Sequence, residues 1–281
     1  MTETYNHYSL FNFSIKSDVN FIGIPITKKQ PDLILQEDLN LEKKTSKTSL
    51  QELSIDKGWI ENKELIAEIK PEIIKYKFLV DLDTHTKQTK LLHQTLPSAL
   101  FQNNRIALHG SAFVYKDVGI LVCGPSTFGK SETINVLSTK FKVISDDIIG
   151  LEISKNTVTI LPGLPFTSIQ HGEDGFSLND RRKRFFKAFH HEDICYENTI
   201  LKKIIILDWG SEYKYKKLNK QEAFKQILAN SFRPLPSSNC LESEKMHFQN
   251  LANLIKYSDQ YIFERKKGDI EASIKLLLKN L

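Results

Sequence analysis

The chain has 281 residues, of which 40% are hydrophobic and 26% charged, so it can bury a sizeable core in one large domain or two smaller ones. The net charge of +5 is mild and reflects a diffuse excess of lysine, which fits an anionic ligand but does not indicate nucleic-acid binding. The three cysteines are far apart and form no C-x-x-C pair, which argues against a disulfide framework or a structural zinc site and favours a reducing cytosol.

No targeting or membrane-spanning segment is expected. The first residues lack the basic start and the apolar core of a signal peptide. No apolar run approaches the roughly 18 residues that are needed to cross a bilayer. We therefore expect a soluble cytoplasmic protein with no membrane partner.

Residues 1–95 have the pattern of a β-rich subdomain. Apolar and polar residues alternate at 11–15 and in part of 19–24, as they do in half-buried strands. Residues 39–57 are polar and rich in Lys, Ser and Thr, which predicts an exposed loop or a weak helix. A short helix is expected at 94–103. Further strands are predicted near residues 33–36, 59–60, 65–69 and 76–81.

The next segment predicts a β-hairpin that leads into a phosphate-binding loop. Two β runs, 106–115 and 118–123, flank a short polar turn at Lys116 and Asp117. The second run is followed by a match to the pattern G-x-x-x-x-G-K-[ST] and then by a predicted helix at 132–140. The matching residues are Gly124-Pro125-Ser126-Thr127-Phe128-Gly129-Lys130-Ser131.

This strand, loop and helix together predict nucleotide binding. Backbone N–H groups of such a loop and the positive end of the helix dipole bind phosphates. Lys130 would neutralise phosphate charge, and the Ser131 hydroxyl would ligate Mg²⁺. The residues expected to contact the nucleotide are Gly124, Ser126, Thr127, Phe128, Gly129, Lys130, Ser131 and Glu132.

A pair of carboxylates follows the loop helix. Residues 141–145 predict a strand that ends in Asp146 and Asp147. At the end of a strand beside a phosphate loop, one carboxylate can hold Mg²⁺ and the other can accept a proton from an attacking hydroxyl. Asp is also common in turns and helix caps. His109, in the first strand of the hairpin, is either a histidine making one structural hydrogen bond or a group of the site.

The remainder of the chain alternates strands and helices. The strand at 201–208 ends in Asp208, a rival for the acidic residue that holds Mg²⁺ in ordinary phosphate-loop NTPases. The basic run from Arg181 to Arg184 is either a solvated face or a contact for substrate phosphate. Other strands are predicted at 148–153, 157–161 and 261–264, and helices at 220–231, 245–256 and 269–281.

The segment around the loop resembles the HPr kinase/phosphorylase catalytic domain and its related serine kinases, which include kinases encoded beside lasso-peptide genes. The resemblance is clearest over residues 105–165. It implies an α/β fold for residues 96–281: a phosphate-loop kinase core related to phosphoenolpyruvate carboxykinase, with a mixed sheet, preceded by the β-rich N-terminal subdomain. The residues that carry it are Leu108-His109-Gly110, Gly124 through Thr133, and Ile144-Ser145-Asp146-Asp147.

The resemblance also implies an activity and residue roles. The protein would be an ATP- and Mg²⁺-dependent kinase that phosphorylates a hydroxyl, either on a peptide or protein serine or on a small molecule. Asp146 resembles the general base, Asp147 supports the metal with Ser131, and His109 lies near the phosphates with Lys130. Relatives are often oligomers, so a homo-oligomer is an expectation.

The sequence departs from the family pattern in two places, and two alternative functions remain open. Thr127 stands where the family usually has Gly, and a β-branched residue resists positive φ. The downstream signature that full HPr kinase/phosphorylases use for HPr docking and phosphorolysis has no clear match, so the reverse reaction is not implied. The alternatives are a nucleotide-binding regulatory module without kinase activity and a generic ATPase that uses Asp208.

Overall fold

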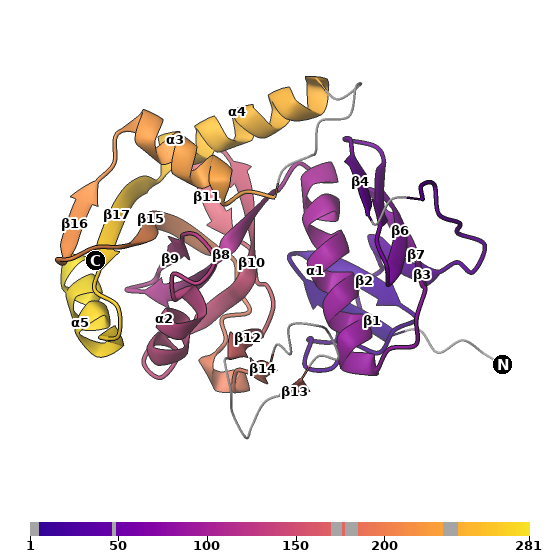
Figure 1. The fold of residues 1–281 in the computed structure, drawn as a ribbon, viewed down its shortest axis with the longest axis horizontal. Coiled ribbons are helices and arrows are strands. Elements are labelled where there is room, and N and C mark those ends of the chain that lie inside the picture. The colour runs from indigo at the N-terminus through magenta and orange to yellow at the C-terminus, as the bar shows by residue number, and fades with distance from the viewer. Residues whose placement is uncertain (1–5, 47–48, 170–175, 178–184, 233–240) are drawn as a thin grey trace. The chain divides into compact units, whose positions relative to one another are not determined.

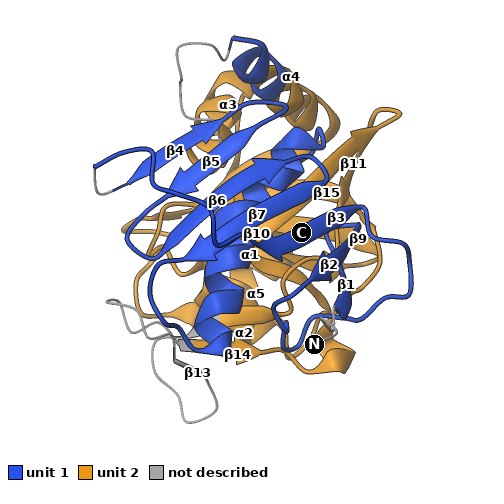
Figure 2. Ribbon diagram, turned by 90° about the vertical axis from the view of Figure 1, so that its right-hand side faces the viewer, with its two compact units in different colours: residues 1–105, 176–184, 233–247 blue, residues 106–175, 185–232, 248–281 orange. Residues whose placement is uncertain are grey.

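The computed structural model describes residues 6–46, 49–169, 176–177, 185–232 and 241–281. The chain divides into two compact units, coloured blue and orange in Figure 2. The first contains residues 1–105, 176–184 and 233–247, and the second contains residues 106–175, 185–232 and 248–281. None of the helices in the described ranges combines the length and the apolar composition that a membrane crossing requires.

The first unit is built on a mixed seven-stranded sheet with the order β1-β2-β3-β7-β6-β5-β4. β3 runs parallel to both of its neighbours, and the other pairs are antiparallel. Phe11 and Asn12 adopt φ of 52° and 59° in the tight β1–β2 turn, which matches the twist of the flanking strands. The strands are β1 Asn6–Leu10, β2 Phe13–Ser17, β3 Leu33–Glu37, β4 Leu50–Leu53, β5 Gly58–Glu61, β6 Leu65–Lys70 and β7 Ile73–Phe78.

Two strand expectations for this unit were wrong. The alternating residues 19–24 form no strand and instead lie in bends that follow β2. The polar stretch 39–57, expected as a loop or weak helix, contains β4, which pairs with β5 along the edge of the sheet. An edge strand can be polar because it pairs with a neighbouring strand along one edge only. A polar strand of this kind cannot be predicted from the alternation of hydrophobic residues.

Helix α1, Thr84–Gln102, is longer than the expected helix at 94–103. Asp83 caps its first turn, since the carboxylate accepts hydrogen bonds from the Thr86 N–H at 2.9 Å and the Thr86 hydroxyl at 2.6 Å. The part of the helix that was not predicted contains Thr84, Thr86 and Thr89, and threonine is a poor helix former. Burial of one face outweighs this propensity, and that face includes Leu91, Leu92, Leu96 and Leu100. The domain boundary expected after residue 95 falls inside this helix.

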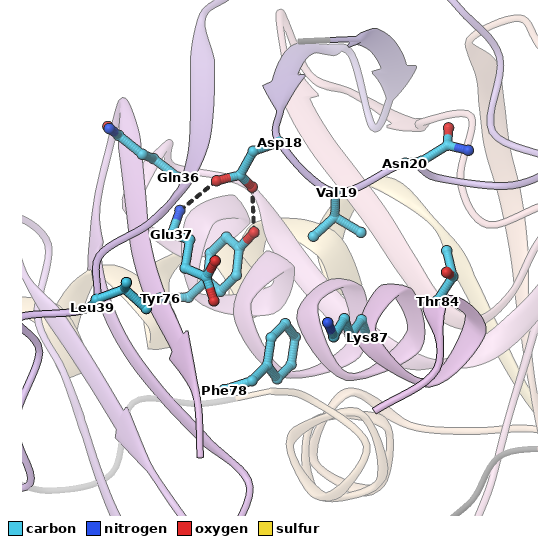
Figure 3. A pocket seen from close by; sticks show the side chains of 10 residues that line it. All are labelled: Asp18, Val19, Asn20, Gln36, Glu37, Leu39, Tyr76, Phe78, Thr84 and Lys87. Atoms are coloured by element: carbon cyan, nitrogen blue, oxygen red, sulfur yellow. Dashed lines mark hydrogen bonds between the residues drawn. The ribbon is translucent and has the colours of Figure 1, made fainter. Parts of the chain in front are cut away.

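A cavity of about 550 Å³ lies within the first unit beside the start of α1 (Figure 3). Both oxygens of the Asp18 carboxylate are already bonded, one by the Tyr76 hydroxyl and the other by the Glu37 N–H at 2.6 Å. The Tyr76 and Phe78 rings meet edge to face with centroids 5.4 Å apart, and the Lys87 ammonium lies 5.8 Å from the Phe78 ring centre. The hydrogen-bonding capacity of the Asp18 carboxylate in this cavity is therefore used by groups of the protein itself.

The second unit is built on a mixed sheet with the order β11-β10-β8-β9-β15-β17-β16. β9, β15 and β17 run parallel, whereas β8, β10 and β11 pair in antiparallel fashion. β11 also pairs with β15, so the five strands β11, β10, β8, β9 and β15 form a closed ring of paired strands. The strands are β8 Ile106–Tyr115, β9 Val118–Cys123, β10 Val143–Ser154, β11 Thr157–Ile160, β15 Thr199–Trp209, β16 Lys214–Lys217 and β17 Asp259–Arg265.

Helices cover both faces of this sheet (Figure 1). Successive side chains of β15 point into two different hydrophobic cores. Ile204 and Ile206 pack with α3 and α4, whereas Ile205 and Leu207 pack with α2 and α5. The helices are α2 Lys130–Leu137, α3 Lys220–Ala229, α4 Leu241–Tyr257 and α5 Ile270–Asn280. Smaller elements of this unit are β12 Phe166–Ile169, β14 Phe185–Ala188 and the 3₁₀ turn η1 His191–Asp193, and the short strand β13 Phe176–Ser177 is assigned to the first unit. The predicted hairpin, loop helix and C-terminal helices are confirmed, and β16 was not predicted.

Candidate active site

The phosphate-loop motif connects β9 to α2. Because β9 ends at Cys123 and runs parallel to β15, the loop begins at the carboxyl ends of the parallel strands, where open α/β sheets bind ligands. Gly124 has φ of 147°, and Gly129, the N-cap of α2, has φ of 74°. A Cβ on Gly124 would lie 2.8 Å from the Leu207 carbonyl oxygen. Both the backbone conformation and the space therefore require glycine at Gly124.

Lys130 is buried at the centre of this loop. Its ammonium donates hydrogen bonds to the carbonyl oxygens of Gly124 at 2.8 Å and Pro125 at 3.0 Å. Burial lowers the pKa of Lys130, and the charges of Asp146 and Asp147 oppose that shift. A positive charge is therefore held against the loop, where it can exchange carbonyl oxygens for phosphate oxygens.

The acidic pair does not end a strand, contrary to the sequence-based expectation. β10 runs unbroken from Val143 to Ser154, so residues 148–153 continue the same strand. β10 pairs with β8, where Asp146 lies opposite Ser111 and Asp147 lies opposite Gly110. Residues 155–156 connect β10 to β11, whose range Thr157–Ile160 confirms the strand predicted at 157–161. A polar pair inside a strand resembles a strand end in sequence, and only the partner strand reveals the difference.

Asp146 is buried and fully hydrogen-bonded. Its two oxygens accept hydrogen bonds from the Ser111 hydroxyl at 2.5 Å and the Thr167 hydroxyl at 2.6 Å. The Ser131 side chain is a further hydrogen-bonding neighbour. Burial raises the pKa of Asp146, and the three hydroxyls partly oppose the shift. Ser131, which is expected to ligate the metal through its hydroxyl, thus lies beside the Asp146 carboxylate.

Asp147 lies next to His109, and both side chains are partly exposed. The His109 Nδ1 atom is 3.0 Å from the Asp147 carboxylate oxygen and 3.0 Å from the Asp147 carbonyl oxygen. Asp147 has φ of 70°, which interrupts the regular alternation of side chains along β10. About a third of the His109 side chain and 28% of the Asp147 side chain remain accessible to solvent. This pair can therefore meet a substrate, whereas Asp146 is enclosed.

A small cavity of about 160 Å³ opens between His109 and the start of the loop. Gly124, Pro125 and Ser126 form one wall, and residues 229–232 form the other. Asn230, which no sequence pattern indicated, connects the two walls through hydrogen bonds. Its side-chain oxygen accepts a hydrogen bond from the Gly124 N–H at 3.1 Å, and its carbonyl oxygen accepts one from the His109 N–H at 2.7 Å.

Arg265 and Trp209 were also missed. Arg265 is 2% exposed and donates a hydrogen bond to the Phe128 carbonyl oxygen at 2.7 Å. The Trp209 ring stacks on the Phe128 ring with centroids 5.7 Å apart. The sequence does offer one signal for these residues, which is their position at the end of an apolar strand. Trp209 is the last residue of β15 and Arg265 the last residue of β17, and these parallel strands end at the edge of the sheet where the loop begins. Thr167 and Ser111 had no signal beyond their polarity.

The remaining predicted residues are less closely tied to this arrangement. Glu132 is exposed in the first turn of α2, where its negative charge favours the helix dipole. Asp208 lies near the end of β15, and its carboxylate accepts a hydrogen bond from the Trp209 N–H at 2.8 Å. The basic run from Arg181 to Arg184 lies outside the described residues.

The donors present fit a nucleoside triphosphate with Mg²⁺. The loop offers backbone N–H groups at a helix N-terminus, Lys130 offers a charge, and Ser131 offers a hydroxyl beside the Asp146 carboxylate. Among the residues that the structure describes, no three His, Cys, Asp or Glu side chains gather as metal ligands. Mg²⁺ at nucleotide sites commonly uses one or two carboxylates with substrate phosphates and water, which this donor set could provide.

Thr127 adopts the conformation that its side chain disfavours, with φ of 70°. A left-handed backbone costs an L-residue roughly 1–2 kcal/mol, part of which a glycine recovers after its own entropy cost. We expect Thr127→Gly to raise the free energy of unfolding by up to about 1 kcal/mol in chemical denaturation.

Thr139→Gly is the matched control, since Thr139 follows the same helix and has no positive φ. Glycine should destabilise the protein there. Equal destabilisation by both variants would show that the loop stores no strain at Thr127.

No protein-family model matches the sequence, and no curated protein matches it either. Among solved structures, the chain is similar to the Hpr(Ser) kinase/phosphatase from Coxiella burnetii, at 13% sequence identity and a TM-score of 0.36. That similarity covers 62% of this chain and 94% of the other. A TM-score this low does not establish a common fold.

Proposed function

We propose that this protein is an ATP- and Mg²⁺-dependent kinase that transfers the γ-phosphoryl group to a hydroxyl acceptor. One observation carries the proposal. A phosphate-loop motif with its lysine is flanked on one side by the Ser131 side chain and the buried Asp146, and on the other by the accessible pair His109 and Asp147. A nucleotide-binding module would need only the loop.

The loop and its neighbours would bind and polarise the nucleotide. Lys130 would leave the carbonyl oxygens of Gly124 and Pro125 and pair with phosphate oxygens. Ser131 would ligate Mg²⁺ and Asp146 would support it by its hydrogen bond to the Ser131 side chain; the metal, when bound, would neutralise part of the charge on the phosphates. Because Ser131 and Asp146 already lie side by side, their arrangement would need little reorganisation.

The geometry favours Asp147 over Asp146 as the general base, which exchanges the two roles expected from the sequence. A base must reach the acceptor hydroxyl, and Asp146 is 1% exposed with both oxygens bonded to hydroxyls. Asp147 is accessible and contacts His109, which can orient the carboxylate and stabilise charge. We therefore assign proton acceptance to Asp147 and metal support to Asp146.

The acceptor would be a peptide or protein serine or a small-molecule hydroxyl. The cavity beside His109 is about 160 Å³, which admits a hydroxyl-bearing group such as a serine side chain. The test is incubation of the protein with ATP, Mg²⁺ and candidate acceptors from cell extract, followed by mass spectrometry of phosphorylated products.

A phosphorylated acceptor is the expected result, and Asp208→Asn should leave its formation unchanged. Tight ATP binding without product in any acceptor class would instead support a regulatory module, for which Thr127 is the best sequence argument. ATP hydrolysis that is lost in Asp208→Asn but kept in Asp146→Asn and Asp147→Asn would support a generic ATPase.

A further inference from the structure

Arg265 is a buried cation beneath the phosphate loop that the roles assigned above do not use. One guanidinium nitrogen, Nη2, donates to the Phe128 carbonyl oxygen at 2.7 Å, and Nη1 donates to the Thr133 hydroxyl at 3.2 Å. The Thr133 hydroxyl in turn donates to the Gly129 carbonyl oxygen at 2.7 Å. The guanidinium therefore joins the loop to the first turn of α2.

Aromatic rings complete the support. The Arg265 guanidinium lies 4.8 Å from the centre of the Trp209 ring, and Phe128 stacks on the same tryptophan. Trp209 and Arg265 are paired residues of the parallel strands β15 and β17. A Cβ on Gly129 would lie 2.1 Å from Nη2, so this glycine is needed for the guanidinium as well as for its own positive φ. Phe128 is thus held through both its ring and its carbonyl group.

Burying this charge is costly. Burial lowers the pKa of Arg265, with Glu132 opposing the shift. Its Nε atom is buried and has no hydrogen-bond partner within the described ranges. A long apolar side chain would fill the same space without that cost. Against this cost stand the two hydrogen bonds by which the forked guanidinium joins the loop to α2.

We propose that Arg265 is a positioning residue that sets the orientation of the phosphate-binding amides, an inference that rests on the proposed function. The peptide unit is planar and trans, so the Phe128 C=O and the Gly129 N–H point in opposite directions. Fixing the carbonyl on Arg265 fixes the Gly129 N–H on the opposite side of that peptide unit, away from the guanidinium. Thr133 extends the same constraint to the start of α2.

The test compares Arg265→Met with Arg265→Lys in the full chain. Arg105→Met is the matched control, because Arg105 also donates to a carbonyl oxygen, that of Phe11 at 3.1 Å, and lies over an aromatic ring, 4.4 Å from the Phe13 centroid. Hydrogen–deuterium exchange of peptides covering residues 124–133 is measured without nucleotide, and ATP affinity and the KM for ATP are measured separately.

We expect Arg265→Met to raise exchange in the loop and to weaken ATP binding roughly 10- to 100-fold, the equivalent of a charge-assisted hydrogen bond. The KM for ATP should rise while kcat at saturating ATP changes little. Arg265→Lys keeps the charge but not the fork, so it should recover part of both effects. Arg105→Met should change neither.

Unchanged loop exchange in Arg265→Met would overturn the inference, as would equal effects of Arg105→Met. If Arg265→Met does not fold, Arg265→Lys must loosen the loop relative to the wild type, and failure to do so also overturns it. A wild-type protein that binds no ATP would defeat the proposed function, yet faster loop exchange in the Arg265 variants would still support the positioning role.

Discussion

Replacing Lys130 with methionine should reduce phosphoryl transfer by roughly 10²- to 10³-fold or more, because the variant loses the charge that would stabilise the transferring group. Methionine has a similar length and no charge to bury, so the lost desolvation cost should offset the two lost hydrogen bonds to the loop. Steady-state turnover, ATP titration and thermal unfolding together measure the effect.

Lys140→Met is the control for this result, since Lys140 is exposed just beyond α2. It should retain full turnover. An active Lys130→Met protein would mean that the loop is not the phosphate site, whatever the acceptor.

Asn at either acidic position should also abolish most transfer, but only Asp146→Asn should raise the stability. Asp147→Asn should bind ATP normally and lose roughly 10²- to 10⁴-fold in transfer, the usual contribution of a general base. Asp146→Asn should also lose transfer, yet unfold at a higher temperature than the wild type. Asp117→Asn, in the exposed β8–β9 turn, is the control and should change neither property.

The stability gain follows from the raised pKa of Asp146. A raised folded-state pKa contributes stability that is fully present below the ordinary carboxyl value of 3.8 and is lost as the pH rises through the folded-state pKa. The ionised carboxylate is therefore a cost at neutral pH, about 1.4 kcal/mol for each tenfold decrease in its acid dissociation constant on folding. Asparagine removes that cost.

The gain from Asp146→Asn should be largest at neutral pH and should shrink as the pH falls toward 4. Denaturant unfolding of the wild type and the variant across this range measures it. A gain that grows toward acid pH would show that Asp146 is stabilised as an anion. Full transfer by Asp147→Asn would return the role of base to Asp146.

Local patterns predicted much of the second unit. The turn at Lys116 and Asp117, the apolar run of β9 and the motif through Ser131 lie within a few residues of one another, so near neighbours decide their backbone. The same reasoning failed for α1, where burial against distant strands overrides poor helix formers, and for β4, whose polar sequence is tolerated at a sheet edge.

The candidate site divides in the same way. The sequence by itself predicted the strand, loop and helix that contain Lys130 and Ser131, and it assigned His109 and the acidic pair to strands. The structure shows that these two strands, β8 and β10, are neighbours. The sequence could not tell the two carboxylates apart, because adjacent residues on a strand share a sequence context but not an environment.

Tertiary structure alone decided which carboxylate is enclosed and which is accessible. Thr167 and Ser111 converge on Asp146, while His109 faces Asp147. It also decided that Arg265, which is distant in sequence from the loop, lies beneath Phe128. The physical reason is that a short segment encodes its own backbone conformation, whereas burial and hydrogen-bond partners depend on strands that only folding brings together.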